Sequence, residues 1–329
     1  MRALLAMSET MAGLFFDDAR RRRLDELVDL VGHGPVTDLS SIPEPELATA
    51  DAVITGWGSP RIDASALSRL PRLRAVVHTA GTVRSVVGQA VWEDPSITVT
   101  TAAQANAVPV AEYTLAQILL AGKHSLRREA EHRRHRGAHD AWSLHDGGNN
   151  GAVVGLVGAS RIGRLVAELL RPFDLTVLIS DPYASEAEIC SLGARKVSLA
   201  DLFAGSDVVS LHAPDLPSTR HMVDAALLAR MRDGSTFVNT ARPALVDLDA
   251  LRAELVSGRL SAVLDVHDDL APDDPLWEVP TVSITPHIAG SQGNELLRMA
   301  DHALEELRRL RAGEPPRHPV DRSALAITA

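Results

Sequence analysis

The chain has 329 residues, of which 45% are hydrophobic and 23% charged, a composition typical of a globular protein with room for two domains. Its formal net charge of −10 argues against nucleic acid or an anionic membrane as the main partner. A single cysteine excludes an internal disulfide, and no stretch resembles a signal peptide or a membrane span, so we expect a cytoplasmic protein.

Helix and strand patterns alternate through the first hundred residues. A helix is expected over 15–31, and a second over 63–70, which Pro71 ends. The expected strands are short and apolar and cover residues 51–55, 74–79 and 97–101. This alternation predicts a small domain with a parallel sheet.

A long helix is expected over 107–123, with Asn106 as its N-cap and Pro109 in its first turn. It is apolar on more than one face, which predicts burial between domains or against another subunit. The segment 128–150 that follows is dense in histidine and arginine. A metal site there is conceivable, but the histidine spacing is irregular, so we favour a solvated connector and expect no metal site.

A glycine-rich turn, GASRIG, lies between an apolar strand at 153–157 and an amphipathic helix. Gly158 allows the sharp turn, Gly163 lets the helix lie close to the sheet, and the helix start suits a pyrophosphate. A second strand, 176–180, leads to Asp181, which can bind both ribose hydroxyls and repels a 2′-phosphate. Ser160 replaces the usual middle glycine. An ordinary turn is the alternative, but the complete pattern favours NAD binding.

The alternation resumes after this unit. Further strands are expected at 207–212, 235–240, 261–266 and 282–285. Further helices are expected at 225–231, 248–256 and 294–311. Cys190 falls in a helical pattern, where we expect an inert, partly buried thiol. The last residues are expected to form a polar tail.

Polar and glycine residues follow successive strands and should gather at one sheet edge, where ligands bind in such folds. They are Gly158, Asp181, His212, Arg242, Asp265 and His287. An arginine can bind a substrate carboxylate, a histidine can transfer a proton near neutral pH, and a carboxylate can orient the imidazole. Singly, Arg242 could be an ion-pair partner, Asp265 a cap and His287 a core histidine. Three such residues at three strand ends favour a site for hydride transfer to a 2-oxo acid.

The motifs VGASRIGR, SDVVSLHAP, FVNTAR, AVLDV and SITPHIAG, together with ANAVPVAEYTLAQILLAG, resemble the NAD-dependent D-isomer-specific 2-hydroxyacid dehydrogenases. The likeness extends over about residues 74–314. It implies two doubly wound parallel-sheet domains: a Rossmann NAD-binding domain at 104–290 and a smaller flavodoxin-like substrate domain at 1–103 and 291–329. It also implies a homodimer acting on a small 2-oxo or 2-hydroxy acid.

The same resemblance assigns roles to individual residues. Arg242 would bind the substrate carboxylate, together with backbone groups of Gly81 and Thr82, and His287 would be the acid–base residue. Asp265 would bind the nicotinamide carboxamide. The expected cofactor-binding residues are Gly158, Ser160, Arg161, Ile162, Asp181, His212, Ala213, Pro214, Thr219, Thr240, Ala241, Asp265, His287 and Gly290.

The chain departs from the family pattern in three places. The text after the LDV strand, HDDLAPDDPLW, is short and lacks the usual catalytic glutamate, so Asp269 is the best substitute and Asp268 the alternative. Pro243 replaces the glycine that usually follows the catalytic arginine. Arg84 is expected near the substrate mouth, either to select an acidic or phosphorylated substrate or to form a surface ion pair.

Two functions are therefore compared. One is an NAD(H)-dependent dehydrogenase, and the other an NAD-sensing interaction module on the same fold with little turnover. The missing glutamate leans toward the sensor, whereas the intact arginine and histidine favour the enzyme more strongly. A hydrolase that uses NAD internally has no supporting nucleophile in this sequence.

Overall fold

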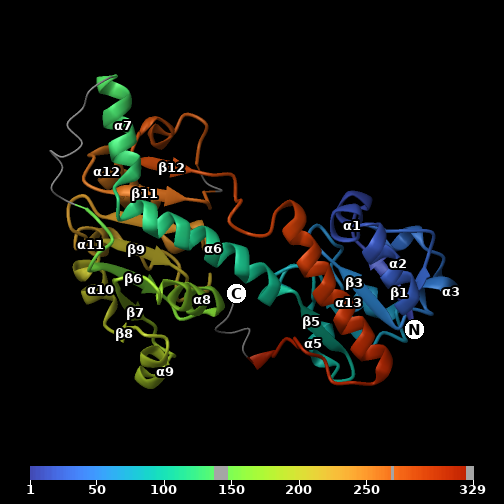
Figure 1. Cartoon of the computed structure of the whole chain (residues 1–329). Coiled ribbons are helices and arrows are strands. Elements are labelled where there is room, and N and C mark those ends of the chain that lie inside the picture. Colours follow the sequence, from blue (N-terminus) through green and yellow to red (C-terminus); the bar gives the residue numbers. More distant parts are fainter. Residues whose placement is uncertain (137–146, 268–269, 324–329) are drawn as a thin grey trace. The chain divides into compact units, whose positions relative to one another are not determined.

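The computed structural model describes residues 1–136, 147–267 and 270–323, which divide into two compact units (Figure 1). Unit one comprises Met1–Ala107 and the described residues from Ser291 onward, and unit two comprises Val108–Gly290. Within the described residues, unit one has a five-stranded and unit two a seven-stranded sheet, and the paired strands in both run parallel. The predicted α/β class with two parallel-sheet domains is confirmed.

The sheet of unit one has the order β2-β1-β3-β4-β5. Its strands are β1 Arg2–Ala6, β2 Asp29–Val31, β3 Ala52–Thr55, β4 Ala75–His78 and β5 Thr98–Thr101. Strands β3, β4 and β5 match the three predicted from the sequence. The sequence analysis missed β1, although it lies inside the sheet and Leu4 and Leu5 are almost wholly buried.

The single helix predicted over 15–31 is wrong. The structure has α1 at Glu9–Phe15 and α2 at Asp18–Leu27, and the chain then enters β2. The reason is local capping, because the Asp17 carboxylate accepts the backbone N–H of Arg20 at 2.9 Å and starts a new helix. The other helices of unit one are α3 Glu44–Leu47, α4 Ala64–Ser68, α5 Gln89–Glu93 and α13 Leu296–Ala312.

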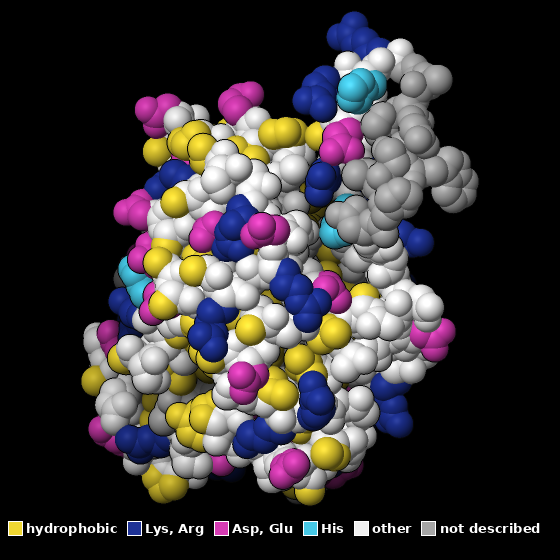
Figure 2. Space-filling model, turned by 90° about the vertical axis from the view of Figure 1, so that its left-hand side faces the viewer, with side chains coloured by type: hydrophobic (Ala, Val, Ile, Leu, Met, Phe, Trp, Pro, Cys, Tyr) yellow, Lys and Arg dark blue, Asp and Glu magenta, His cyan; other side chains and the backbone are white. Residues whose placement is uncertain are grey.

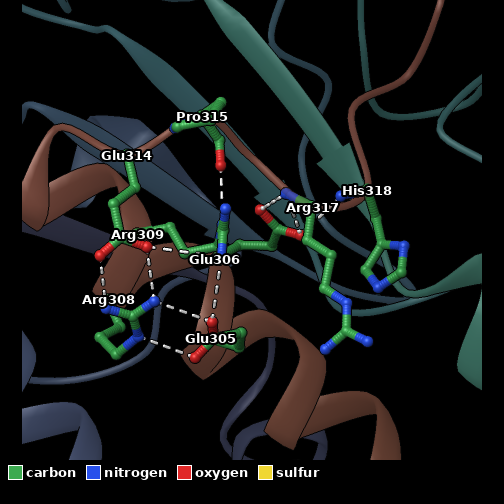
Figure 3. A network of polar contacts seen from close by, with 8 residues as sticks. All are labelled: Glu305, Glu306, Arg308, Arg309, Glu314, Pro315, Arg317 and His318. Carbon is green, nitrogen blue, oxygen red and sulfur yellow. Dashed lines mark hydrogen bonds and ion pairs between the residues drawn. The ribbon is translucent and has the colours of Figure 1, made fainter.

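The chain after α13 is part of the fold of unit one, so the expectation of a simple tail is wrong. The N–H of Val320 donates to the carbonyl of Val99 at 2.8 Å, and Pro319 lies opposite Thr100 as an antiparallel bridge. The buried carboxylate of Glu306 accepts backbone N–H groups of Arg317 and His318 (Figure 3). This segment therefore covers β5, which would otherwise be a sheet edge.

The sheet of unit two has the order β12-β11-β10-β9-β6-β7-β8. Its strands are β6 Ala152–Val157, β7 Leu175–Ser180, β8 Arg195–Lys196, β9 Val208–Leu211, β10 Thr236–Asn239, β11 Ser261–Leu264 and β12 Val282–Ile284. Neighbouring residues of β9 enter different cores, Val208 one and Val209 the other, so the sheet is covered on both faces. All of the strands predicted for this region are confirmed.

Helices cover both faces of this sheet (Figure 1). Besides the long helix described below, the helices of unit two are α7 Ser125–His135, α8 Arg161–Leu170, α9 Glu186–Ser191, α10 Leu199–Gly205, α11 Ala225–Leu228 and α12 Leu248–Val256. The connector predicted over 128–150 therefore begins inside the helix α7. Residues 137–146 of the connector lie outside the described residues. Cys190 on α9 is exposed, which corrects the expectation of partial burial.

The long helix α6 spans Ala103–Ala121, so the prediction that Asn106 caps it is wrong. The N–H of Asn106 already donates to the carbonyl of Ala102 at 3.0 Å, as in a regular helix. The Asn106 carboxamide instead accepts the N–H of Ser291 at 3.0 Å. Pro109 consequently lies inside the helix and not in its first turn.

The surface of the described residues carries both charge signs. On the face drawn in Figure 2, basic and acidic side chains are interspersed. None of the helices in the described part of the chain has the length and apolarity needed to cross a membrane.

Candidate active site

One edge of the seven-stranded sheet carries six of the residues predicted from the sequence: Gly158, Asp181, His212, Arg242, Asp265 and His287. Because the strands are parallel, the carboxyl ends of β6, β7, β9, β10, β11 and β12 all meet there. The chain runs outward from β6 in one direction to β7 and β8, and from β9 in the other direction to β12. The boundary between β6 and β9 is a topological switch point, where ligands bind in open α/β sheets.

The glycine-rich turn at this switch point is packed too tightly for larger residues. Gly158 has a φ of +101°, and a Cβ there would lie 3.0 Å from the nitrogen of Ala213. A Cβ on Gly163 would lie 2.1 Å from the carbonyl oxygen of Gly158. Gly158 is therefore required by the close approach of the loop that follows β9, and Gly163 by the close approach of α8 to the glycine turn itself.

The start of α8 offers unused donors to an anion. Ser160 is the N-cap residue, and its hydroxyl accepts the N–H of Gly163 at 3.4 Å. The backbone of Ser160 is extended, so this position does not require glycine. The N–H groups of Arg161 and Ile162 have no acceptor among the described residues. Since these groups lie at the positive end of a ten-residue helix, they fit a pyrophosphate.

Asp181 lies at the end of β7 and fastens the glycine turn. One oxygen accepts the N–H of Ala159 at 2.7 Å, and the other accepts those of Tyr183 at 2.7 Å and Ala184 at 2.9 Å. Its side chain is half-buried, and the oxygen that accepts the Ala159 N–H retains acceptor capacity for a hydroxyl. These features fit the ribose of NAD.

The loop after β9 brings together four of the expected cofactor residues. His212 is buried, its Nε2 lies 3.0 Å from the Ser210 hydroxyl, and burial lowers the pKa of its imidazole to about 3. Ala213 packs against the glycine turn. The hydroxyl of Thr219 donates to the carbonyl of Pro214 at 2.6 Å, which ties the loop to itself. The neutral imidazole and this closed loop form a rigid wall beside the turn.

Arg242 follows β10 and is held by its backbone. The Asn239 side chain accepts the N–H of Ala241 at 3.0 Å and donates to the carbonyl of Arg242 at 3.1 Å. The Thr240 hydroxyl is buried and lies 3.0 Å from that of Thr114 on α6. The Arg242 guanidinium donates to the Ala241 carbonyl at 2.6 Å and has no carboxylate partner among the described residues. It is therefore free to bind an anionic ligand.

The turn that carries His287 is fastened by Asp265. His287 has a φ of +56°, which is uncommon for a residue other than glycine. The Asp265 carboxylate is 1% exposed and accepts the N–H groups of Ile288 at 2.8 Å and Ala289 at 2.9 Å, together with the Thr285 hydroxyl at 2.7 Å. The exposed imidazole of His287 is thus presented by a turn that a buried charge holds.

The expected substrate loop belongs to unit one, and its donors are available. The N–H groups of Gly81 and Thr82 have no acceptor among the described residues. Thr101 supports the loop, because its hydroxyl lies 2.8 Å from the carbonyl oxygen of Ala80 and 2.6 Å from that of Gly81. Two free N–H groups on a supported loop fit a carboxylate. Arg84 lies on the same loop and is exposed.

Beneath this loop lies His78, which the sequence analysis did not select. Its Nδ1 lies 2.9 Å from the Thr55 hydroxyl, and burial lowers the pKa of its imidazole to about 4. Three further supporting residues were not predicted: Asn239, Thr285 and Thr101. In the sequence, each of these residues is a polar residue at or just after the end of a strand. That pattern does not indicate which residue its side chain contacts. Asp268 and Asp269 lie outside the described residues.

The comparisons with known proteins address the same region. Residues 115–289 match the family model described as D-isomer specific 2-hydroxyacid dehydrogenase, NAD binding domain. The D-3-phosphoglycerate dehydrogenase of Mycobacterium tuberculosis is 33% identical over 287 residues, which are 85% of this chain and 52% of the relative. The chain thus spans about half the length of the curated phosphoglycerate dehydrogenases it matches.

Two further proteins are similar over most of their own length. The glyoxylate reductase of Aeropyrum pernix is 32% identical over 290 residues, which are 84% of this chain and 85% of the relative. The crystal structure of D-lactate dehydrogenase from Aquifex aeolicus, complexed with NAD and lactic acid, has a TM-score of 0.71 and 26% identity. That match covers 95% of this chain and 96% of the other.

Proposed function

The chain belongs to the D-isomer specific 2-hydroxyacid dehydrogenase family and contains its NAD-binding domain, and from this premise we propose that it reversibly reduces a small 2-oxo acid to the D-2-hydroxy acid with NADH. The observation that carries the proposal is the buried Asp265 carboxylate fastening the His287 turn. This turn belongs to the same sheet edge as the glycine turn and the Arg242 loop.

Bound NADH supplies the hydride for reduction, and NAD⁺ accepts it in the reverse direction. The Arg242 guanidinium binds the substrate carboxylate with two donors, which fixes the orientation of the neighbouring carbonyl and draws electrons from it. In unit one, the free N–H groups of Gly81 and Thr82 are the proposed donors to a carboxylate. Protonated His287 donates its proton to the oxygen that becomes the hydroxyl, and neutral His287 removes that proton in the reverse direction.

The cofactor is proposed to bind along the sheet edge of unit two. The free N–H groups of Arg161 and Ile162 would hold the pyrophosphate, and Asp181 the adenosine ribose. The negative charge of Asp181 disfavours a 2′-phosphate, so NADH is expected to be preferred over NADPH.

Asp269, with Asp268 as the alternative, is proposed to orient the His287 imidazole in place of the usual glutamate. A carboxylate beside the imidazole would fix its orientation, so removal of the carboxylate should change the pH dependence of the reduction. We would compare the pH profile of kcat for Asp269→Asn and Asp268→Asn. If only the second variant shifts the profile, the role belongs to Asp268.

The test of the proposed activity is a panel of 2-oxo acids assayed by NADH absorbance, run in parallel with NADPH. Glyoxylate, pyruvate and a phosphorylated hydroxypyruvate represent the small, apolar and acidic side chains. Turnover of at least one acid with NADH is the expected result. A protein that binds NADH but reduces none of them would instead support the NAD-sensing alternative.

A homodimer is the assembly that we propose for this enzyme. Leu120 on α6 is 49% exposed and extends the apolar character of that helix to its surface. Light scattering after size-exclusion chromatography should give twice the chain mass of 35.2 kDa. Elution with the mass of a single chain at assay concentration would contradict the dimer.

A further inference from the structure

The side chain of His267 contacts the turn that carries His287. Its Nε2 lies 3.1 Å from the backbone carbonyl oxygen of Thr285. The same carbonyl accepts the N–H of His287 at 2.9 Å, which closes a three-residue turn around Pro286. One carbonyl oxygen therefore joins the His267 side chain to the backbone of His287.

The His267 ring is itself held from another side. It lies edge-on against the indole of Trp277, with ring centroids 5.5 Å apart and an interplanar angle of 84°. The indole N–H donates to the carbonyl of Ala271 at 2.9 Å, and the N–H of Leu270 donates to the carbonyl of His267 at 2.9 Å. The ring and the backbone of His267 thus each have a partner other than Thr285.

We propose that His267 is a positioning residue, which holds the Thr285 carbonyl and thereby the backbone turn that aims the His287 imidazole. This inference rests on the proposed function, because it explains the orientation of the residue that is proposed to transfer the proton. His287 has a positive φ, and its turn needs support from outside its own backbone. Asp265 supplies that support at Ile288 and Ala289 and at the Thr285 hydroxyl, and His267 supplies it at the Thr285 carbonyl.

The contact has the chemistry of a fixed support and not of a switch. A carbonyl oxygen only accepts, so the Nε2 atom of His267 carries the proton and donates. The neutral imidazole with a proton on Nε2 and the imidazolium both provide this donor.

Two substitutions separate the hydrogen bond from the ring contact. His267→Gln keeps a donor near the position of Nε2 but loses the aromatic ring. His267→Phe keeps the edge-on contact with Trp277 but loses the donor. Loss of one hydrogen bond to the turn should lower kcat about 10-fold in His267→Phe, with the KM for NADH unchanged. His267→Gln should retain kcat within about threefold of the parent.

The measurement of kcat is paired with an NMR measurement that does not depend on enzyme activity. In protein labelled with ¹³C in its histidine rings, the NMR signal of His287 should shift or broaden in His267→Phe and keep its position in His267→Gln. Thermal unfolding of both variants identifies any general loss of folding. Equal effects of the two substitutions on kcat and on the His287 signal would overturn the proposal, as would an unchanged signal in His267→Phe. A parent protein inactive with every 2-oxo acid would contradict the proposed function, while the NMR comparison would still test the role of His267.

Discussion

The carboxylate of Asp265 accepts a hydrogen bond at 2.8 Å from the backbone N–H of Ile288, the residue directly after His287. The acceptor is 1% exposed and lies at the end of β11, whereas the donor belongs to an exposed turn beyond β12. A charged acceptor shielded from water binds such donors strongly. The orientation of the proposed acid–base residue therefore depends on a neighbouring strand.

Asp265→Asn should loosen this turn. The carboxamide has one oxygen for donors that now use two, and its NH₂ group would face the N–H of Ala289. We expect a loss of about 2–3 kcal/mol in the free energy of unfolding of unit two and a fall in kcat of about tenfold or more, measured by urea unfolding and steady-state assays. Asp249→Asn is the matched control, because that side chain is 93% exposed, and it should change neither quantity. Equal behaviour of the two variants would contradict the support role.

His287→Asn should remove the proton donor without disturbing the fold. Asparagine tolerates the positive φ of +56° better than most residues, so the turn is preserved. We expect kcat/KM for the 2-oxo acid to fall by about 10²–10⁴. The Kd for NADH and the Tm should stay close to those of the parent. Undiminished turnover would show that His287 is not the acid–base residue.

Asp181→Asn should change the choice of cofactor. The substitution removes a negative charge that repels a 2′-phosphate but leaves one oxygen for the N–H groups of Ala159 or Tyr183. We expect the ratio of kcat/KM for NADH to that for NADPH to fall by about tenfold or more. Asp181→Ala should lower the Tm further, since it removes all three backbone contacts. An unchanged ratio in Asp181→Asn would refute the ribose assignment.

Two buried histidines predict a loss of stability in acid. Burial lowers the pKa of His78 to about 4 and that of His212 to about 3, from an ordinary value of 6.5. Between these values and pH 6.5 the unfolded chain binds more protons than the folded one, so stability falls as the pH falls through this window. The expected slope is about 1.4 kcal/mol per pH unit for each histidine, and it disappears above the window.

Urea unfolding of each unit between pH 4 and 7 checks this slope. His78→Asn should flatten the profile of unit one, and His212→Asn that of unit two. Each variant leaves the profile of the other unit as a control. A profile that keeps its full slope in both variants would assign the acid sensitivity to other groups.

Glu306→Gln should detach the C-terminal segment from β5. The carboxylate is 2% exposed and accepts N–H groups of Arg317 at 3.0 Å and His318 at 2.8 Å, as Figure 3 shows. Hydrogen exchange at the N–H groups of Thr101 and Val320 should accelerate about tenfold or more, because both donate across this pairing. The KM for the 2-oxo acid should rise, since Thr101 supports the substrate loop. Glu305→Gln, which removes a charge from the half-buried ion pairs with Arg308 and Arg309, should leave the exchange unchanged.

The sequence predicted the residues of the candidate site better than their contacts. Gly158, Asp181, Arg242 and His287 were selected because each follows an apolar strand, and parallel pairing brings such ends to one edge. The partners of these residues did not follow from that pattern. Asp265 was expected to bind the cofactor, yet its oxygens accept backbone N–H groups of the His287 turn. His267 precedes two acidic residues, and no periodicity distinguished it from a loop residue.

By itself, the sequence determined the fold class, every strand described in the NAD-binding unit except β8, and the family, because hydrophobic periodicity and glycine-turn chemistry are properties of neighbouring residues. Only the tertiary structure decided that β1 joins the first sheet, that Asn106 binds Ser291 and that the C-terminal segment covers β5. These contacts join residues far apart in the chain, and they form only when packing brings a donor and an acceptor within hydrogen-bond distance.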